Sequence, residues 1–121
     1  MTAVRLVVED VDAAIVALTS AGCTLEQRWG PPFAIMRSDD TELWVSGPGT
    51  SAAEATTQLT GDVAVRAAVR LVREVDDIGP AVEELLAAGW ETAAGPVTGP
   101  GGSQVVLRNG PLLLEVFAAG S

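Results

Sequence analysis

Residues 3–22 read AVRLVVEDVDAAIVALTSAG, and residues 68–89 repeat this pattern as AVRLVREVDDIGPAVEELLAAG, with two additional residues before the helix ends. In both copies a short strand-like stretch precedes apolar residues spaced three and four apart, which is the spacing of an amphipathic helix. Both helical stretches stop at a glycine, Gly22 or Gly89, where helices commonly terminate. The repeat therefore predicts two similar strand–helix units in one chain.

An acidic residue opens each predicted helix. This residue is Asp12 in the first copy, and Asp76 or Asp77 in the second. Acids suit the first helical turn because they accept hydrogen bonds from its free N–H groups and oppose the helix dipole.

Three short strands are predicted after each helix, separated by turn sequences such as GPP, SDD and NG. Residues 47–66 are rich in Gly, Ser, Thr and Ala, and we interpret them as a linker with a short helix around 51–58. A βαβββ unit alone buries too little of its sheet, so we expect modules 1–46 and 67–121 to share a core as one α+β domain. The predicted strands are 24–29, 33–37 and 41–46 in the first module and 90–94, 103–108 and 111–117 in the second.

The composition limits the chemistry that the chain can perform. Sixteen acids against seven bases give a net charge of −9, so we expect no nucleic-acid partner. Histidine, the commonest general base and transition-metal ligand, is absent, and the single cysteine, Cys23, is expected to be a small core residue. No apolar run reaches the ~18 residues of a membrane span and no signal-peptide pattern opens the chain, so we expect a cytoplasmic protein without a membrane partner.

The paired βαβββ plan, the two strand–acid–helix–AG openings and the RNGPLLLEVF ending at 108–117 resemble the vicinal oxygen chelate superfamily, which includes glyoxalase I, extradiol dioxygenases and bleomycin-resistance proteins. The resemblance covers essentially the whole chain. It implies a concave mixed sheet with helices on its outer face. It also implies a homodimer, in which the two halves are exchanged between subunits in some members.

In the metal-dependent members, four ligands line the concave sheet, and the resemblance places them at Ala3, Trp44, Ala68 and Glu115. Three of these residues cannot bind a metal, and one carboxylate makes a poor transition-metal site. The resemblance therefore implies the branch without a metal or other cofactor. Within it, the nearest in character are the resistance proteins that sequester bleomycin, mitomycin or enediyne-type products, so an aromatic natural product or antibiotic is the implied partner.

Strand alternation extends these four positions to their neighbours, because residues two apart share a face. Aliphatic residues then face the helices, namely Leu43, Val45, Leu112, Leu114 and Val116. Apolar walls with a few charged groups are what a ligand cleft requires. With Trp44 and Glu115, the concave face is predicted to carry Arg5, Val7, Glu42, Ser46, Arg70, Leu113 and Phe117.

Two of these residues allow more than one interpretation. Glu115 lies in an apolar run, so it needs a compensating partner: an ion pair with Arg5 or Arg70, a ligand hydroxyl or amine, or a role in acid–base catalysis. Trp44 would either offer a flat platform to an aromatic ligand or fill the space of the lost metal site.

Other features are expected at the edge of the cleft. Trp29 and Phe33 flank the stiff turn in WGPPF and are predicted to contact the ligand or a second subunit at the cleft mouth. Trp90 is expected in the core. The Gly/Pro-rich segment 95–104 is interpreted either as a mobile flap over the cleft or as an ordinary long hairpin.

The function predicted from the sequence and the resemblance together is non-catalytic sequestration of a bulky, partly aromatic small molecule. The alternative is a metal-independent isomerase, cyclase or lyase with Glu115 or Glu42 as base and Arg5 or Arg70 steadying an anion. A divalent-metal enzyme that uses the two glutamates is a weaker alternative. A purely structural dimerisation module would fill the cleft with its own side chains.

Overall fold

The computed structural model describes residues 2–120. In chain order its elements are β1 (Thr2–Val7), α1 (Val11–Ser20), β2 (Thr24–Trp29), β3 (Phe33–Ser38), β4 (Thr41–Ser46), α2 (Ser51–Thr57), α3 (Gly61–Ala67), β5 (Val69–Glu74), α4 (Ile78–Ala87), β6 (Glu91–Gly99), β7 (Gly102–Asn109) and β8 (Leu112–Ala119).

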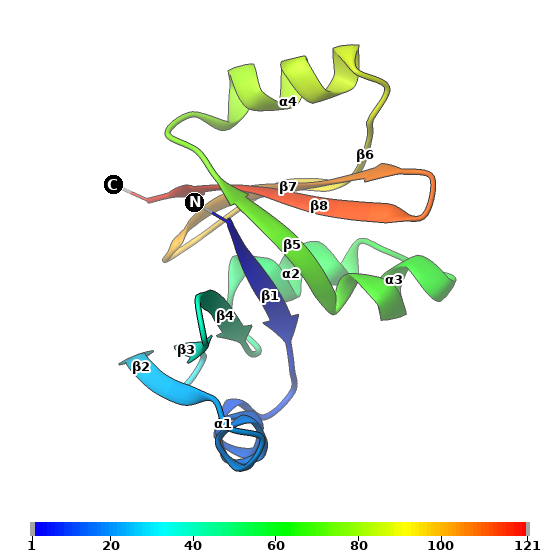
Figure 1. The fold of residues 1–121 in the computed structure, drawn as a ribbon. Coiled ribbons are helices and arrows are strands. Elements are labelled where there is room, and N and C mark those ends of the chain that lie inside the picture. The colour runs from blue at the N-terminus through cyan, green and yellow to red at the C-terminus, as the bar shows by residue number, and fades with distance from the viewer. Residues whose placement is uncertain (1, 121) are drawn as a thin grey trace.

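The strands form one eight-stranded sheet in the order β2-β3-β4-β1-β5-β8-β7-β6 (Figure 1). The two halves join at its centre, where β1 and β5 pair antiparallel and Arg5 lies opposite Arg70. β1 pairs parallel with β4, and β5 pairs parallel with β8. The predicted α+β fold with two βαβββ repeats is therefore confirmed. The halves join here within one chain, and their exchange between subunits stays a prediction.

Acidic caps and glycine stops delimit the two repeated helices. The side chain of Asp10 caps α1 by accepting a hydrogen bond from a first-turn amide, and Asp77 does the same for α4. Asp12 lies inside the first turn, so its predicted place as the opening residue was two positions too late. Gly22 and Gly89 follow the helices with φ of 99° and 103°, a left-handed conformation that glycine adopts without steric cost.

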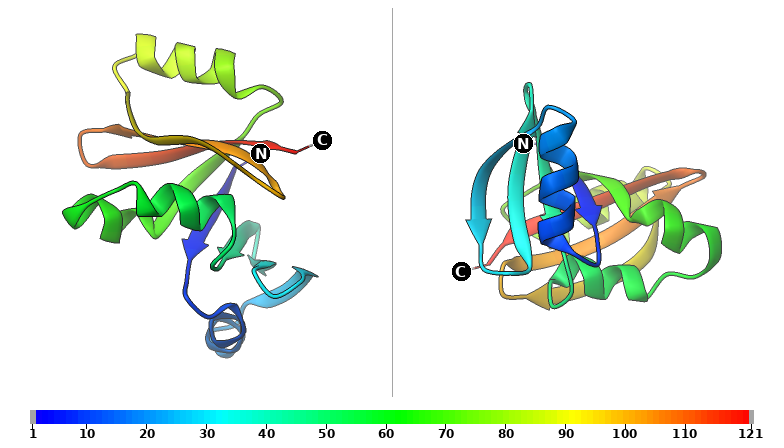
Figure 2. Two further views of the ribbon diagram at one scale, coloured as in Figure 1. Left: turned by 180° about the vertical axis from the view of Figure 1, so that it is seen from behind. Right: turned by 90° about the horizontal axis from the view of Figure 1, so that it is seen from below.

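Helices α1 and α4 cover the outer face of the two half-sheets (Figures 1 and 2). Val45 lies in the cluster that packs under α1, and Val116 lies in the cluster under α4, as strand alternation predicted. Trp90 packs against the α4 cluster, and Cys23 is partly buried against the α1 cluster. Leu112 is 60% exposed, so its predicted packing against a helix is wrong, because α4 does not extend over the start of β8.

The segment interpreted as a linker contributes two helices to the inner face of the second half. α2 and α3 lie on the opposite side of β6–β8 from α4 (Figure 1). Ala55 and Leu59 from this segment, with Ala67 at the end of α3, form an apolar cluster with residues of β6 and β7. The expected helix around 51–58 is present, whereas α3 was not predicted. Half of the concave face is therefore filled by the chain itself.

The Gly/Pro-rich segment 95–104 belongs mainly to the β6–β7 hairpin. β6 extends to Gly99 and β7 begins at Gly102, and the two pair through Thr98 and Ser103. Of the two interpretations, the long hairpin is the one that the structure contains.

The centre of the outer face lies between α1 and α4 and carries exposed aliphatic side chains. Val69 is 62% exposed, Leu71 is 53% exposed, and Leu112 lies two strands from β1 on the same side of the sheet.

Among residues 2–120, no helix combines the length and apolar character needed to cross a bilayer.

Candidate functional site

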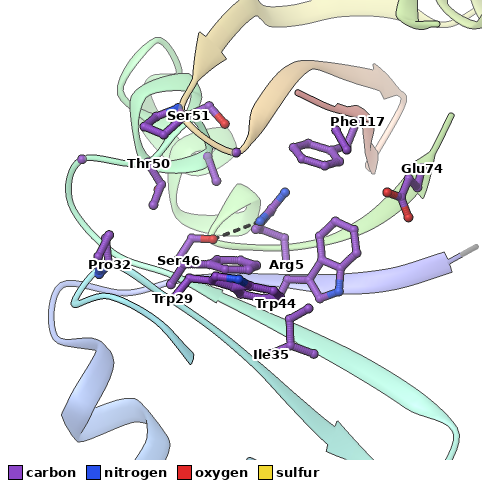
Figure 3. A pocket seen from close by; sticks show the side chains of 16 residues that line it. Arg5, Trp29, Pro32, Ile35, Trp44, Ser46, Thr50, Ser51, Glu74 and Phe117 are labelled. Atoms are coloured by element: carbon purple, nitrogen blue, oxygen red, sulfur yellow. Dashed lines mark hydrogen bonds between the residues drawn. The ribbon is translucent and has the colours of Figure 1, made fainter. Parts of the chain in front are cut away.

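A cavity of about 580 Å³ opens on the inner face of the first half, where no linker helix fills the concavity (Figure 3). Its size falls within the ~300–1,000 Å³ that is usual for small-molecule sites. Its walls come from both halves of the chain and from the segment that leads into α2. Six of the predicted site residues line it: Arg5, Trp29, Phe33, Trp44, Ser46 and Phe117.

Arg5 forms the floor of this cavity between aromatic side chains. Its guanidinium carbon lies 5.1 Å from the ring centroid of Trp44, 5.4 Å from Phe117 and 6.0 Å from Phe33. Distances within ~6 Å permit cation–π attraction, which is strongest where water is excluded. Trp44 and Phe117 also contact each other edge to face, with centroids 5.5 Å apart. The rings and the guanidinium therefore hold each other in one arrangement.

Glu115 lies below this floor and is wholly buried. Its Oε1 accepts hydrogen bonds from Nε of Arg5 at 3.1 Å and from Nε of Arg70 at 2.9 Å, and its Oε2 accepts from Nη2 of Arg5. Both carboxylate oxygens are thus occupied by guanidinium groups. The geometry is that of the ion-pair interpretation, and it places Glu115 out of reach of the cavity.

Arg70 is the second arginine of this buried cluster and does not line the cavity. Besides Glu115, its guanidinium donates to Thr56 Oγ1, to Gln104 Oε1 and to the backbone carbonyls of Ala52 and Ala67. Burial lowers the pKa of the Arg70 guanidinium from its usual value; the attraction of Glu115 opposes this shift, and the charge of Arg5 adds to it. Arg70 therefore fastens α2, α3 and β7 to the centre of the sheet.

Glu42 orients Trp44 instead of facing the cavity. Its Oε1 accepts a hydrogen bond from Nε1 of Trp44 at 2.9 Å, and its Oε2 accepts from Arg37 at 3.3 Å. Trp44 is only 6% exposed, so most of its indole fills space among its neighbours and part of it borders the cavity. Trp44 thus fills space in the way that one interpretation expected, and the part of its indole at the cavity is where the other interpretation places a ligand.

Trp29 and Phe33 stand at the cavity wall as a stacked pair with centroids 5.4 Å apart. Trp29 is 51% exposed, and it therefore offers far more open aromatic surface than Trp44. Leu113, in contrast, packs against the apolar cluster beneath the linker helices and lies outside the cavity.

Several lining residues were not found from the sequence. Thr50 and Ser51 come from the supposed linker, and Glu74 ends β5 on the far side of the aromatic residues from Ser51 (Figure 3). Gln104 lies behind the wall, fully buried, and links Arg70 to Ser51 through hydrogen bonds of 2.9 and 3.2 Å. The acid at the end of β5 continues the alternation of Arg70, so Glu74 was the one residue that the sequence pattern could have indicated.

The metal of the metal-dependent superfamily members does not fit these residues. Of the positions that the resemblance gave to its ligands, Ala3 and Trp44 belong to an apolar cluster, and the oxygens of Glu115 are taken by two arginines. Among residues 2–120, no group of three or more His, Cys, Asp or Glu side chains is arranged to hold a metal ion.

Comparison with known proteins gives matches at the level of structure only. No family model matches the sequence, and no curated protein matches it either. A Legionella pneumophila protein described as an NAD-dependent benzaldehyde dehydrogenase superposes with a TM-score of 0.74 at 12% identity, over 99% of this chain and 100% of that chain. A glyoxalase/bleomycin resistance protein/dioxygenase superfamily member from Vibrio splendidus 12B01 superposes with a TM-score of 0.57 at 11% identity, over 98% and 97%. A hypothetical protein from Bacillus halodurans gives 0.61 at 13% identity, over 98% and 92%.

These likenesses establish the fold. The chain has the fold of the glyoxalase/bleomycin resistance protein/dioxygenase superfamily, as its repeated βαβββ pattern indicated. At such low identity the activities of the neighbours are not carried over.

Proposed function

We propose that this protein binds a flat, partly aromatic small molecule in the 580 Å³ cavity and holds it without altering it. The observation that carries the proposal is the cavity wall itself, in which the open face of Trp29 stands near a fixed group of Trp44, Phe33 and Phe117 around Arg5. Aromatic side chains provide large, rigid contact surfaces for planar ligands. Protection by such binding is stoichiometric, and resistance to an antibiotic is the biological role we propose.

The arrangement of Glu115 and Glu42, the two carboxylates predicted as bases, supports binding over catalysis by either of them, although a third carboxylate, Glu74, does border the cavity. Glu115 is enclosed by two arginines, and Glu42 accepts hydrogen bonds from Trp44 and Arg37. A general base needs a free oxygen within reach of the substrate proton, and neither of these carboxylates offers one in this geometry. The metal-independent isomerase, cyclase or lyase stays the alternative. The open cavity argues against a purely structural module, which would fill it.

We also propose that the protein forms a homodimer through the centre of its outer face. The exposed aliphatic residues Val69, Leu71 and Leu112 lie there, and the outward positions of β5 carry one charge, Arg73, and no acid. Two copies that each carry a net charge of −9 would meet with least repulsion where the outward strand positions carry no acid. A second copy of this chain is therefore the occupant we expect for this surface.

The binding proposal is tested by titrating the intrinsic tryptophan fluorescence with planar antibiotics and flavin-like heteroaromatics. The Trp90→Phe variant is the background of choice, because Trp90 packs against α4 and not at the cavity. Saturable quenching that weakens in Trp29→Ala, with the ligand recovered unchanged by mass spectrometry, is the expected result. Recovery of an altered ligand would favour the enzyme alternative, and the absence of quenching by every compound would refute the binding proposal.

A further inference from the structure

The buried cluster beneath the cavity contains one more positive charge than negative charges. Arg5 and Arg70 both pair with Glu115, and in the described part of the chain neither makes an ion pair with another acid. Arginine stays protonated in proteins, so the cluster carries a net charge of about +1. A buried charge without a counterion is costly, and a negative group that arrives in the cavity would reduce this cost.

The two arginines differ in how many of their hydrogen-bond donors are used. A guanidinium has five N–H donors. Arg70 makes five hydrogen bonds, to Glu115, Thr56, Gln104 and two backbone carbonyls. Arg5 makes three, two to Glu115 and one to Ser46, which leaves one N–H on each terminal nitrogen without a partner among residues 2–120. Of the two, Arg5 is the one that borders the cavity.

Two serine hydroxyls at the cavity each accept a hydrogen bond from a buried side chain. Ser46 Oγ accepts a hydrogen bond from Arg5 at 3.0 Å, and Ser51 Oγ accepts one from Gln104 at 3.2 Å. Gln104 is itself held by Arg70 through its carbonyl oxygen. A serine hydroxyl that accepts still has its proton to donate, and both serines border the cavity. The two serine hydroxyls can therefore donate into the cavity, whereas the hydroxyl of Thr50, which also borders it, already donates to the carbonyl oxygen of Gly47.

We propose, on the basis of the aromatic-binding function above, that the cavity selects flat aromatic compounds that carry an anionic oxygen group such as an aryl carboxylate. The oxygens accept hydrogen bonds from the unused N–H groups of Arg5 and from the Ser51 hydroxyl, while the ring lies against Trp29 and Phe33. A planar carboxylate matches two neighbouring N–H donors of one guanidinium.

Glu74 gives the bound molecule a direction. Its carboxylate borders the cavity on the far side of Phe117 from Ser51, as Figure 3 shows, and it makes no ion pair with a described residue. It repels an anionic group at its own end and favours it at the Arg5 end. A ligand with an additional amine would place that amine toward Glu74.

The test compares three probes with the same naphthalene ring by tryptophan fluorescence at about 0.15 M salt, where exposed charges are screened beyond ~8 Å. The probes are 2-naphthoate, 2-naphthamide and 2-naphthylmethylammonium. We expect 2-naphthoate to bind at least 10-fold more tightly than either of the others, against the net charge of −9 that favours the cation. Ser51→Ala should weaken 2-naphthoate several-fold and the ammonium probe not at all, whereas Glu74→Gln should strengthen 2-naphthoate.

The outcomes separate the two proposals. Equal binding of the three probes, or tighter binding of 2-naphthylmethylammonium, overturns the selection of anions and leaves the aromatic site intact. Failure of all three to bind at millimolar concentration overturns the aromatic site itself. Unchanged 2-naphthoate binding in a folded Ser51→Ala protein shows that Ser51 does not contact the carboxylate and contradicts the proposed arrangement of donors.

Discussion

Replacement of Glu115 by Gln should destabilise this protein more than any other isosteric change on its inner sheet face. Glu115 is wholly buried, and its two oxygens accept hydrogen bonds from Arg5 and Arg70. Gln keeps the shape and one oxygen, but it removes the only carboxylate with which either arginine pairs in the described part of the chain. The side-chain amide of Gln would also direct its N–H groups toward the guanidinium N–H groups of Arg5 and Arg70, which need acceptors.

The size of the effect follows from this geometry. Removal of one partner from a buried ion pair costs ~3–5 kcal/mol, because the remaining charge is left without compensation. Two arginines are affected here, so we expect a loss of about 4 kcal/mol or more in the free energy of unfolding. With an unfolding entropy of ~2.1 cal/mol/K per residue, a chain of 121 residues has about 0.25 kcal/mol/K, which converts this loss into a melting temperature about 16 °C lower.

Urea unfolding followed by circular dichroism, with calorimetry beside it, measures this loss. Glu26→Gln is the matched control, because Glu26 pairs with Arg37 at 2.7 Å while both side chains remain about one-third exposed. The control should cost less than ~1 kcal/mol and lose its effect in high salt, whereas the Glu115→Gln effect should persist. If Glu115→Gln cost no more than the control, the premise of a buried, charged cluster would be refuted.

Three further results are expected. Gly102→Ala should destabilise the protein by at least about 2 kcal/mol in urea unfolding, because φ of Gly102 is 149° and a Cβ would lie 2.3 Å from the carbonyl oxygen of Ala118. In the control Gly101→Ala, the added Cβ meets open space, so the stability should change little. Equal stabilities of the two variants would show that the β7–β8 contact can relax. Trp29→Ala should weaken 2-naphthoate binding about 3- to 10-fold through loss of aromatic contact, with Trp90→Phe unchanged as the control. Wild-type protein should have the mass of a dimer in multi-angle light scattering and Leu71→Glu that of a monomer, and a monomeric wild type would contradict the proposed outer-face contact.

The sequence was informative where its pattern is local and repeated. The AVRLV stretches and the glycine stops predicted both strand–helix units, and alternation along β4 and β8 placed Val45 and Val116 against the helices. Alternation also brought Arg5 and Glu115 to the same face, where they pair. These inferences depend only on the two-residue period of a strand, which the chain keeps throughout these elements.

Helix α3 and the packing of the linker segment were not predicted, because the composition of this segment carries no strong periodic signal. Ala and Thr make up nearly half of residues 51–67. What these residues pack against depends on the bare inner face of β6 and β7, which no local pattern reveals. The same reason hid Ser51 and Gln104, whose contact joins residues 53 positions apart. The predicted packing of Leu112 against a helix is wrong for a related reason. Strand alternation predicts which face of the sheet a residue lies on, but it does not predict how far the helix on that face extends.

The cavity lies on the first half only because the two halves differ in two respects: one residue of the last strand, and the presence of α2 and α3 over the second half. Trp44 and Glu115 occupy equivalent positions in the last strands of their modules, while Arg5 and Arg70 lie opposite each other at the centre. A carboxylate in both modules would give each arginine its own counterion. With Trp44 in one of them, the cluster keeps an excess positive charge on the side where the indole forms a wall. α2 and α3 cover the other half, where every N–H donor of Arg70 makes a hydrogen bond. The excess positive charge and the open cavity therefore both lie at Arg5.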